Sequence, residues 1–155
     1  MSTIPGSAAA PLIATCAGIG GLRPGPGTWA SLATLPFAWL VATLAGPLVL
    51  FAAVLVLLVV GVWAVDHYVR ETGREDPPEV VIDEVVGMSL VLTVTEPHWL
   101  PYLVAFALFR LIDIVKPWPI RLIDRQLKGG IGAMLDDVVA GMVAALAMLV
   151  LEPLL

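Results

Sequence analysis

Long uncharged segments constrain the fold of this chain more than any other feature of its sequence. No Asp, Glu, Lys or Arg occurs between residues 31 and 65, and 18 of the 21 charged residues lie in two windows, residues 66–84 and 110–137. Apolar residues make up 59% of the 155 residues and charged residues only 14%, whereas a soluble domain is about 25% charged. The composition indicates a membrane protein and excludes a disordered chain or a disulfide scaffold. No broad basic face is present, which excludes a nucleic-acid partner.

Helix-breaking residues divide the apolar stretches into helices. Gly46-Pro47 interrupts the first stretch and Glu96-Pro97-His98 the second, so each is expected to fold as a hairpin. The predicted helices cover residues 31–45, 47–65, 85–95, 98–112 and 138–152. Crossing a membrane takes about 20 helical residues, so some shorter segments are expected to pack inside the bundle. The predicted fold is all-α: a compact helical bundle forming one domain over residues 1–155, embedded in a membrane through two hairpins and a C-terminal helix.

The positions of the basic residues predict an orientation. Hairpins return the chain to the side it left, so Arg23 and the two charged windows are expected on one side. Every Lys and Arg of the chain lies in these three places. Short cytoplasmic loops of membrane proteins carry an excess of Lys and Arg. The charged loops are therefore predicted to share the cytoplasmic side.

Two acidic pairs stand in apolar surroundings. Asp83-Glu84 lies within VVIDEVVG, and Asp136-Asp137 lies within AMLDDVVAG. Such carboxylates are costly unless a cation or hydrogen bonds compensate them. One interpretation is that both pairs cap helix N-termini, where negative charge contributes about 0.3–1 kcal/mol. The other is a Mg²⁺ site, since Mg²⁺ prefers carboxylate oxygens, water and phosphate as ligands. Adjacent helical residues point about 100° apart, so one member of each pair is expected to bind the metal directly.

A basic segment lies between the acidic pairs. Pro117 and Pro119 end one helix, and a short helix with a basic face is expected to follow at the membrane surface. Gly129-Gly130 is predicted to end it. The basic face could simply anchor the chain to anionic lipid, or its residues could bind a phosphate, for which arginine is well suited. The candidate phosphate-binding residues are Arg110, Lys116, Arg121, Arg125 and Lys128.

A glycine-rich segment, GLRPGPGTWAS (residues 21–31), is the remaining polar island. Thr28 is predicted to be the N-cap of the following helix, and free N–H groups there are a candidate phosphate contact. A cysteine phosphatase needs an arginine six residues after its cysteine, but Leu22 follows Cys16 at that spacing. Of the two histidines, His98 is expected on the opposite side, so a histidine-centred triad lacks parts. Carboxylates, a metal and basic groups remain, which fits metal-assisted hydrolysis.

Four segments of the chain resemble the phosphatidylglycerophosphatase A family. They are PGPGTWAS with SLATLP (24–36), VVIDEVVGM (80–88), FRLIDIVKPWPIRLIDR (109–125) and KGGIGAMLDDVVAG (128–141). The similarity extends from about Gly18 to about Ala144. It implies an α-helical protein of the bacterial inner membrane that removes the terminal phosphate from phosphatidylglycerophosphate with Mg²⁺, giving phosphatidylglycerol and phosphate. The family's acidic motif residues correspond to Asp83, Glu84, Asp136 and Asp137, and its basic ones to Arg110, Lys116, Arg121 and Arg125.

The residues suggest a mechanism and leave alternatives open. In the hypothesis we favour, the four acidic residues hold Mg²⁺ and a water attacks phosphorus. Basic groups hold the phosphomonoester, and Lys116 and Arg121 are the first choices for this role. A covalent phosphoenzyme on Asp83 or Asp136 is the alternative. A carrier or assembly subunit would instead place its carboxylates near the bilayer midplane. A related lipid phosphatase with another phosphomonoester substrate also fits the sequence.

Small residues on the last predicted helix leave the oligomeric state open. Ala140 and Ala144, like Gly141 and Ala145, have the spacing of four residues that permits close helix packing. Packing inside the bundle is the interpretation we favour, and homodimerisation is the alternative.

Overall fold

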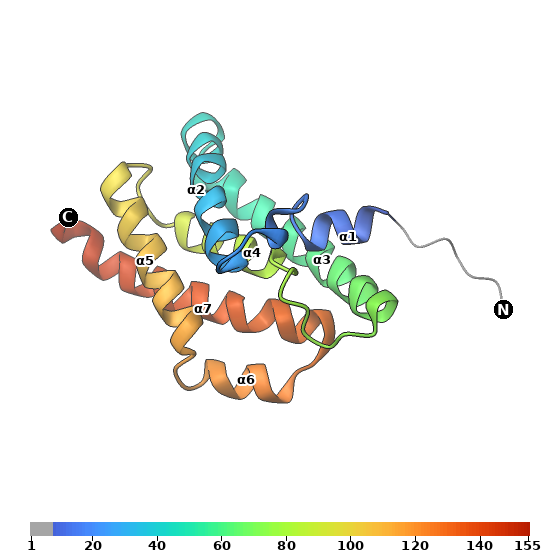
Figure 1. The fold of residues 1–155 in the computed structure, drawn as a ribbon. Coiled ribbons are helices and arrows are strands. Elements are labelled where there is room, and N and C mark those ends of the chain that lie inside the picture. Colours follow the sequence, from blue (N-terminus) through green and yellow to red (C-terminus); the bar gives the residue numbers. More distant parts are fainter. Residues whose placement is uncertain (1–7) are drawn as a thin grey trace.

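Glycine and proline residues set several helix ends in the computed structural model, which describes residues 8–155 apart from the side chains of residues 123 and 124. Gly46, with a φ of 89°, alone separates two long helices, and Pro47 opens the second, where its missing N–H costs nothing. The regular structure of the described residues is helical, which confirms the predicted all-α class (Figure 1). The elements are α1 (Ala9–Ala14), the 3₁₀ helix η1 (Ile19–Gly21), α2 (Pro26–Ala45), α3 (Pro47–Thr72), α4 (Ile82–Leu92), α5 (Trp99–Val115), α6 (Ile120–Gln126), α7 (Gly129–Leu151) and the 3₁₀ helix η2 (Glu152–Leu154).

Helices α4 and α7 pack against each other at the centre of the bundle. α7 also contacts α3, α5 and α6, and α4 also contacts α2, α3 and α5. Two glycines permit this approach. A Cβ on Gly141 would lie 2.6 Å from the Gly87 carbonyl oxygen, and a Cβ on Gly87 would lie 2.7 Å from the Asp137 carbonyl oxygen. Since both obstacles are backbone atoms, any side chain here would force the two helices apart.

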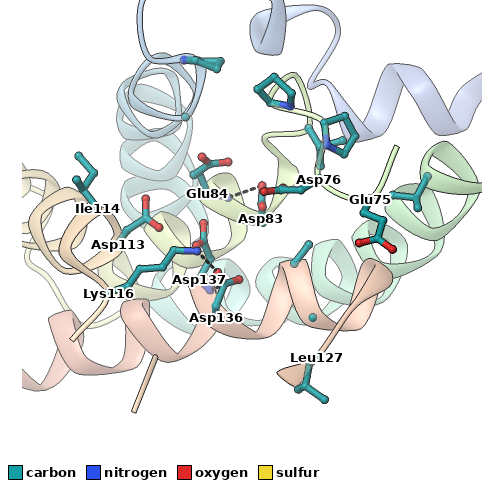
Figure 2. A pocket seen from close by; sticks show the side chains of 18 of the residues that line it. Glu75, Asp76, Asp83, Glu84, Asp113, Ile114, Lys116, Leu127, Asp136 and Asp137 are labelled. Carbon is teal, nitrogen blue, oxygen red and sulfur yellow. Dashed lines mark hydrogen bonds and ion pairs between the residues drawn. The ribbon is translucent and has the colours of Figure 1, made fainter. Parts of the chain in front are cut away.

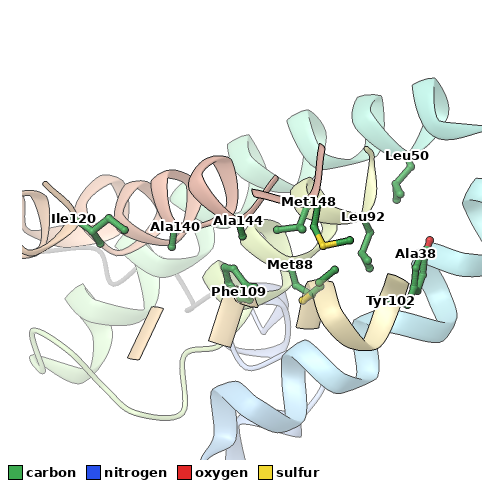
Figure 3. Close-up of a cluster of buried hydrophobic side chains, with 12 residues drawn as sticks. Ala38, Leu50, Met88, Leu92, Tyr102, Phe109, Ile120, Ala140, Ala144 and Met148 are labelled. Atoms are coloured by element: carbon green, nitrogen blue, oxygen red, sulfur yellow. The ribbon is translucent and has the colours of Figure 1, made fainter. Parts of the chain in front are cut away.

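Apolar side chains on both sides of this contact form the core. One cluster centres on α4, α5 and α7, with Met88, Phe109 and Met148 fully buried, and also takes in residues of α2, α3 and α6 (Figure 3). A second cluster joins α1, α3, α4 and α7 around Val65 and Met134. The core thus fixes α4 in position from several directions.

Within residues 8–155, three helices are long and apolar enough to cross a membrane. They are α2, α3 and the segment from α7 through η2, with 20, 26 and 26 residues. Many of their apolar side chains point outward: Phe37 is 70% exposed and Leu48 is 78% exposed. Surfaces of this kind suit lipid better than water.

The second predicted hairpin differs from the first. α4 and α5 have 11 and 17 residues, fewer than the about 20 that a span needs. Seven residues of α4 are buried in the protein, as expected for a short segment that packs inside the bundle. Insertion of α4 and α5 into a membrane as a hairpin stays a prediction.

The start of α2 corrects one expectation. α2 begins at Pro26 instead of near residue 31, because Gly25 adopts a φ of 66° and Pro26 opens the helix. Thr28 is therefore not the N-cap. It lies inside the first turn, where its N–H donates to the Gly25 carbonyl oxygen at 3.0 Å.

The start of α7 also differs from the sequence-based expectation. The sequence placed the last helix at residues 138–152, but α7 begins at Gly129, directly after the short loop that follows α6. The Gly130 N–H donates to Asp66 Oδ1 of α3 at 2.6 Å, which satisfies one of the N–H groups that have no partner within the helix. A Cβ on Gly130 would lie 2.4 Å from the Val62 carbonyl oxygen. Gly130 therefore lets the first turn of α7 pack on α3.

The glycine contact between α4 and α7 predicts an unusual effect of alanine. In a helix interior, Gly→Ala ordinarily stabilises a protein by about 0.5–1 kcal/mol. We expect Gly141→Ala to destabilise this protein by about 1–3 kcal/mol, because the added Cβ meets backbone. The thermal unfolding midpoint of the detergent-solubilised protein measures the effect. Gly21→Ala is the control, since a Cβ at Gly21 would have open space around it; a midpoint for Gly141→Ala at or above the wild-type value contradicts the packing argument.

Candidate functional site

The two charged windows of the sequence meet in one cavity of about 700 Å³. It lies where the N-terminal ends of α2 and α4, the C-terminal end of α5 and the first half of α7 come together (Figure 2). Seven acidic and three basic side chains line it, an excess of four negative charges. They are Glu75, Asp76, Asp83, Glu84, Asp113, Asp136 and Asp137, with Arg110, Lys116 and Lys128.

The first acidic pair lies in the first turn of α4. Negative charge is favoured in this turn, but the N-cap is Val81 and no side chain makes a capping hydrogen bond, so neither Asp83 nor Glu84 caps the helix. Asp83 Oδ1 accepts a hydrogen bond from the Glu84 N–H at 3.1 Å. Glu84 reaches across to α2, where a Cβ on Gly27 would lie 1.8 Å from its Oε1. Gly27 thus leaves the space that the Glu84 carboxylate occupies.

The second acidic pair has a different position. Asp136 and Asp137 lie about two turns inside α7, so capping does not explain them. Asp136 Oδ2 accepts a hydrogen bond from Lys116 Nζ at 2.6 Å, and Asp136 Oδ1 accepts one from the Asp137 N–H at 3.1 Å. Asp137 is only 4% exposed. These carboxylates are held in the bundle by the packing of α7.

Three carboxylates from the two pairs form a group that could hold a metal ion. One oxygen each of Asp83, Glu84 and Asp137 lies within 4.8 Å of the other two. Glu84 Oε2 and Asp137 Oδ2 are buried, and no hydrogen-bond partner for either occurs among the described residues. Burial and the neighbouring Glu84 and Asp137 carboxylates raise the pKa of Asp83 well above its ordinary value. Arg110, 3.9 Å from Glu84 Oε1, is the nearby cation, and the carboxylate oxygens are ligands that suit a hard divalent cation.

We expected one residue of each acidic pair to be a direct metal ligand, and only the geometry of the Asp136-Asp137 pair agrees with this. Asp137 belongs to the group of three, while its neighbour Asp136 is paired with Lys116. Asp83 and Glu84 both contribute an oxygen. The longer Glu84 side chain brings its carboxylate back toward that of Asp83, although the two Cα–Cβ bonds diverge along the helix.

Three of the predicted basic residues line the same cavity, each beside a carboxylate. The Arg110 guanidinium contacts the Asp113 carboxylate, and it lies 3.9 Å from Glu84 Oε1. Lys116 follows α5 in a left-handed conformation, with a φ of 46°, and pairs with Asp136. Lys128 is exposed and pairs with Glu75 at 2.9 Å.

The other predicted phosphate contacts lie elsewhere. Arg121 and Arg125 line a second, smaller cavity, of about 420 Å³, which adjoins the first at Lys116. Thr28 is not among the residues that line either cavity, although its neighbours Gly25 and Gly27 line the first.

Glu75, Asp76, Asp113 and Gly27 line the cavity and were not predicted as site residues from the sequence. Asp113 is buried, lines the cavity and pairs with Arg110. Its position three residues after Arg110 on one helix is a recognisable ion-pair spacing, so the sequence did contain a signal. Gly27 gave none, because its role depends on where Glu84 lies.

A family model and two curated relatives identify one family, and a third relative has a different name. The family model described as phosphatidylglycerophosphatase A matches residues 12–152. Phosphatidylglycerophosphatase A of Escherichia coli (strain K12) is 39% identical over 77% of this chain and 70% of its own length. The protein of the same name from Haemophilus influenzae is 34% identical over 91% of this chain and 87% of its own length. A Bacteroides thetaiotaomicron protein, provisionally named a phosphatidylinositol-3-phosphatase, is 42% identical over 69% of this chain and 64% of its own length. No solved structure matches the chain significantly.

The contact between Gly27 and Glu84 predicts a selective effect of one methyl group. We expect Gly27→Ala to displace the Glu84 carboxylate from the group of three and to weaken divalent-cation binding about 10- to 100-fold. Because the displaced atoms end a flexible side chain, the unfolding midpoint should stay close to that of the wild type. Titration calorimetry with Mg²⁺ or Mn²⁺ measures the affinity. Unchanged cation binding by Gly27→Ala would show that Glu84 is not a ligand.

Proposed function

This chain belongs to the phosphatidylglycerophosphatase A family, and we propose that it hydrolyses the terminal phosphomonoester of phosphatidylglycerophosphate to phosphatidylglycerol and inorganic phosphate. The carboxylate cavity is the observation that carries the proposal. It combines three converging carboxylates with Arg110 and Lys116, and it adjoins helices apolar enough to enter a membrane. The matched region, residues 12–152, includes all of these residues.

We propose that Mg²⁺ is the cofactor and that Asp83, Glu84 and Asp137 hold it. The unpartnered buried oxygens of Glu84 and Asp137 support this, as does the excess of acidic side chains in the cavity. Mg²⁺ commonly takes one or two carboxylates together with water and phosphate oxygens. When bound, the ion would polarise the phosphoryl oxygens and lower the charge that builds up on them during attack.

In the proposed function, the basic residues of the cavity bind the phosphomonoester. Lys116 Nζ lies 2.6 Å from Asp136 Oδ2, so this carboxylate orients the ammonium group toward the cavity. Asp113 similarly restrains the Arg110 guanidinium, which can form two parallel hydrogen bonds with a phosphate. Lys128 is exposed and paired with Glu75, so it is the least committed of the three to this role. Because acidic side chains outnumber basic ones in the cavity, binding of a phosphate there also needs the proposed cation.

Hydrolysis requires one water and one proton acceptor. The water oxygen forms a bond to phosphorus, the bond from phosphorus to the glycerol oxygen breaks, and that oxygen takes a proton. Asp136 lies beside the phosphate-holding Lys116 and outside the group of three carboxylates. We assign to Asp136 the role of orienting the water and accepting its proton. Covalent phosphorylation of Asp83 or Asp136 is the competing route.

The cellular position follows from the charge distribution. The three basic regions of the sequence are expected to face the cytoplasm by the positive-inside rule. The active face would then lie on the cytoplasmic side of the bacterial inner membrane. A soluble phosphate product would be released there.

A second candidate substrate class has one specific observation in its favour. The provisional name of the Bacteroides relative refers to a phosphorylated inositol lipid. This substrate also carries a phosphomonoester on a lipid head group, which the same cavity chemistry could hydrolyse. Comparing phosphate release from the two lipids in mixed micelles decides between them.

Neutralising the metal-binding carboxylates tests the proposed function. We expect purified protein to release phosphate from phosphatidylglycerophosphate with Mg²⁺ and to stop when EDTA is added. Asp83→Asn and Asp137→Asn should each lower kcat/KM by about 100-fold or more, because a metal ion contributes several kcal/mol to phosphoryl transfer and about 1.4 kcal/mol corresponds to a factor of ten. Glu71→Gln removes the same charge at an exposed position outside both cavities and serves as the control. Wild-type turnover in both Asn variants would refute the metal assignment.

An acid-quench experiment tests the route of attack. With substrate labelled in the terminal phosphate, direct attack by water leaves no label on the protein during turnover. A labelled protein would establish a phosphoenzyme, and the residue that carries the label, Asp83 or Asp136, located by digestion and mass spectrometry, would identify the nucleophile.

A further inference from the structure

The second cavity is lined by two arginines, Arg121 and Arg125, that have no role in the proposed reaction. Its volume is about 420 Å³, and it is formed by the end of α5, the Pro117-Trp118 linker and α6. Arg121 and Arg125 line it from one face of α6, four residues apart. Lys116 lines both this cavity and the carboxylate cavity, so the two are adjacent.

The charge of the second cavity is opposite to that of the first. Three basic residues line it, Lys116, Arg121 and Arg125, and its described lining includes no acidic residue. Among the described residues, neither Arg121 nor Arg125 has an ion-pair partner, whereas Arg110 and Lys128 in the first cavity both pair with a carboxylate. Lys116 is paired with Asp136, so the two arginines supply the positive charge in this concave site that favours an anion.

Apolar side chains around the arginines indicate that the anion belongs to a lipid. Trp118 is 82% exposed, and Leu122 and Val115 are also exposed. All three line the cavity. Tryptophan is enriched at the level of lipid head groups, where one side of a site is apolar and the other is wet. A free phosphate ion would gain nothing from these apolar contacts.

We infer that Arg121 and Arg125 form a second anion subsite, which holds the phosphodiester of the lipid substrate while its terminal phosphomonoester lies in the carboxylate cavity. The inference rests on the proposed function. In phosphatidylglycerophosphate, a single three-carbon glycerol links the two phosphates. The two cavities are adjacent, because Lys116 lines both of them. The subsite selects lipids that carry both groups, and it distinguishes them from phosphatidic acid, which lacks the diester.

Phosphatidylglycerol is a suitable probe of this subsite because it carries the diester and no phosphomonoester. We expect a soluble short-chain phosphatidylglycerol to bind the wild-type protein in neutral detergent. The double variant Arg121→Gln/Arg125→Gln should bind it about tenfold or more weakly, because charge-assisted hydrogen bonds to the diester are lost. Titration calorimetry gives both affinities. Inhibition of turnover by inorganic phosphate should be the same in both proteins, since phosphate alone enters the carboxylate cavity.

Turnover gives a second readout. For phosphatidylglycerophosphate, the double variant should show a raised KM with a smaller change in kcat, as expected when binding common to the ground and transition states is lost. Arg23→Gln/Arg70→Gln removes the same charge from exposed positions outside both cavities and should resemble the wild type in both assays.

The outcomes separate the subsite from the proposed function. Unchanged binding of short-chain phosphatidylglycerol in Arg121→Gln/Arg125→Gln overturns the subsite, even if association with anionic vesicles falls, because α6 would then be only a surface anchor. Equal weakening in the Arg23→Gln/Arg70→Gln control overturns it as well. The binding assay needs no turnover. A protein that fails to hydrolyse phosphatidylglycerophosphate therefore refutes the proposed function while the binding result still decides the subsite.

Discussion

The backbone contact between α4 and α7 is the constraint on which the rest of the structure depends. Gly87 and Gly141 let the two helices approach until a Cβ on either would meet backbone of the other. Asp83 and Glu84 are at the start of α4, and Asp137 is one turn of α7 before Gly141. The same contact therefore sets the distance between the carboxylates, and a side chain at either glycine would disturb the core and the site together.

The carboxylate group carries an electrostatic cost that the bundle alone does not remove. Three carboxylates converge within 4.8 Å, and burial in the protein disfavours their charged forms. The nearby cations are partly engaged, with Arg110 beside Asp113 and Lys116 beside Asp136. Apolar packing around Met88, Phe109 and Met134 holds the helices that carry these acids. The proposed Mg²⁺ would offset this repulsion and would attract the phosphate of the substrate.

The arrangement of the two cavities suits chemistry on a lipid. The acidic cavity is inside the bundle, whereas the basic one lies under α6 beside the exposed Trp118. α2, α3 and α7 provide apolar surface long enough to enter a bilayer. In the proposed function, the lipid head group would enter the carboxylate cavity while its acyl chains remain in the bilayer.

Much of this could be predicted from the sequence, because it depends on local pattern. Uncharged stretches and the Gly46-Pro47 break predicted the all-α class and a helix boundary, and the acidic pairs in apolar surroundings predicted which residues gather in the cavity. Only the tertiary structure decided the division of roles. In the structure, Asp136 pairs with Lys116, and Arg121 and Arg125 line a separate cavity. Asp113 lines the carboxylate cavity, and Gly27 leaves the space that Glu84 occupies. The physical reason is that a sequence pattern fixes which face of a helix a side chain occupies, while its partners come from helices distant in the chain, and backbone contacts at glycines determine how closely those helices approach.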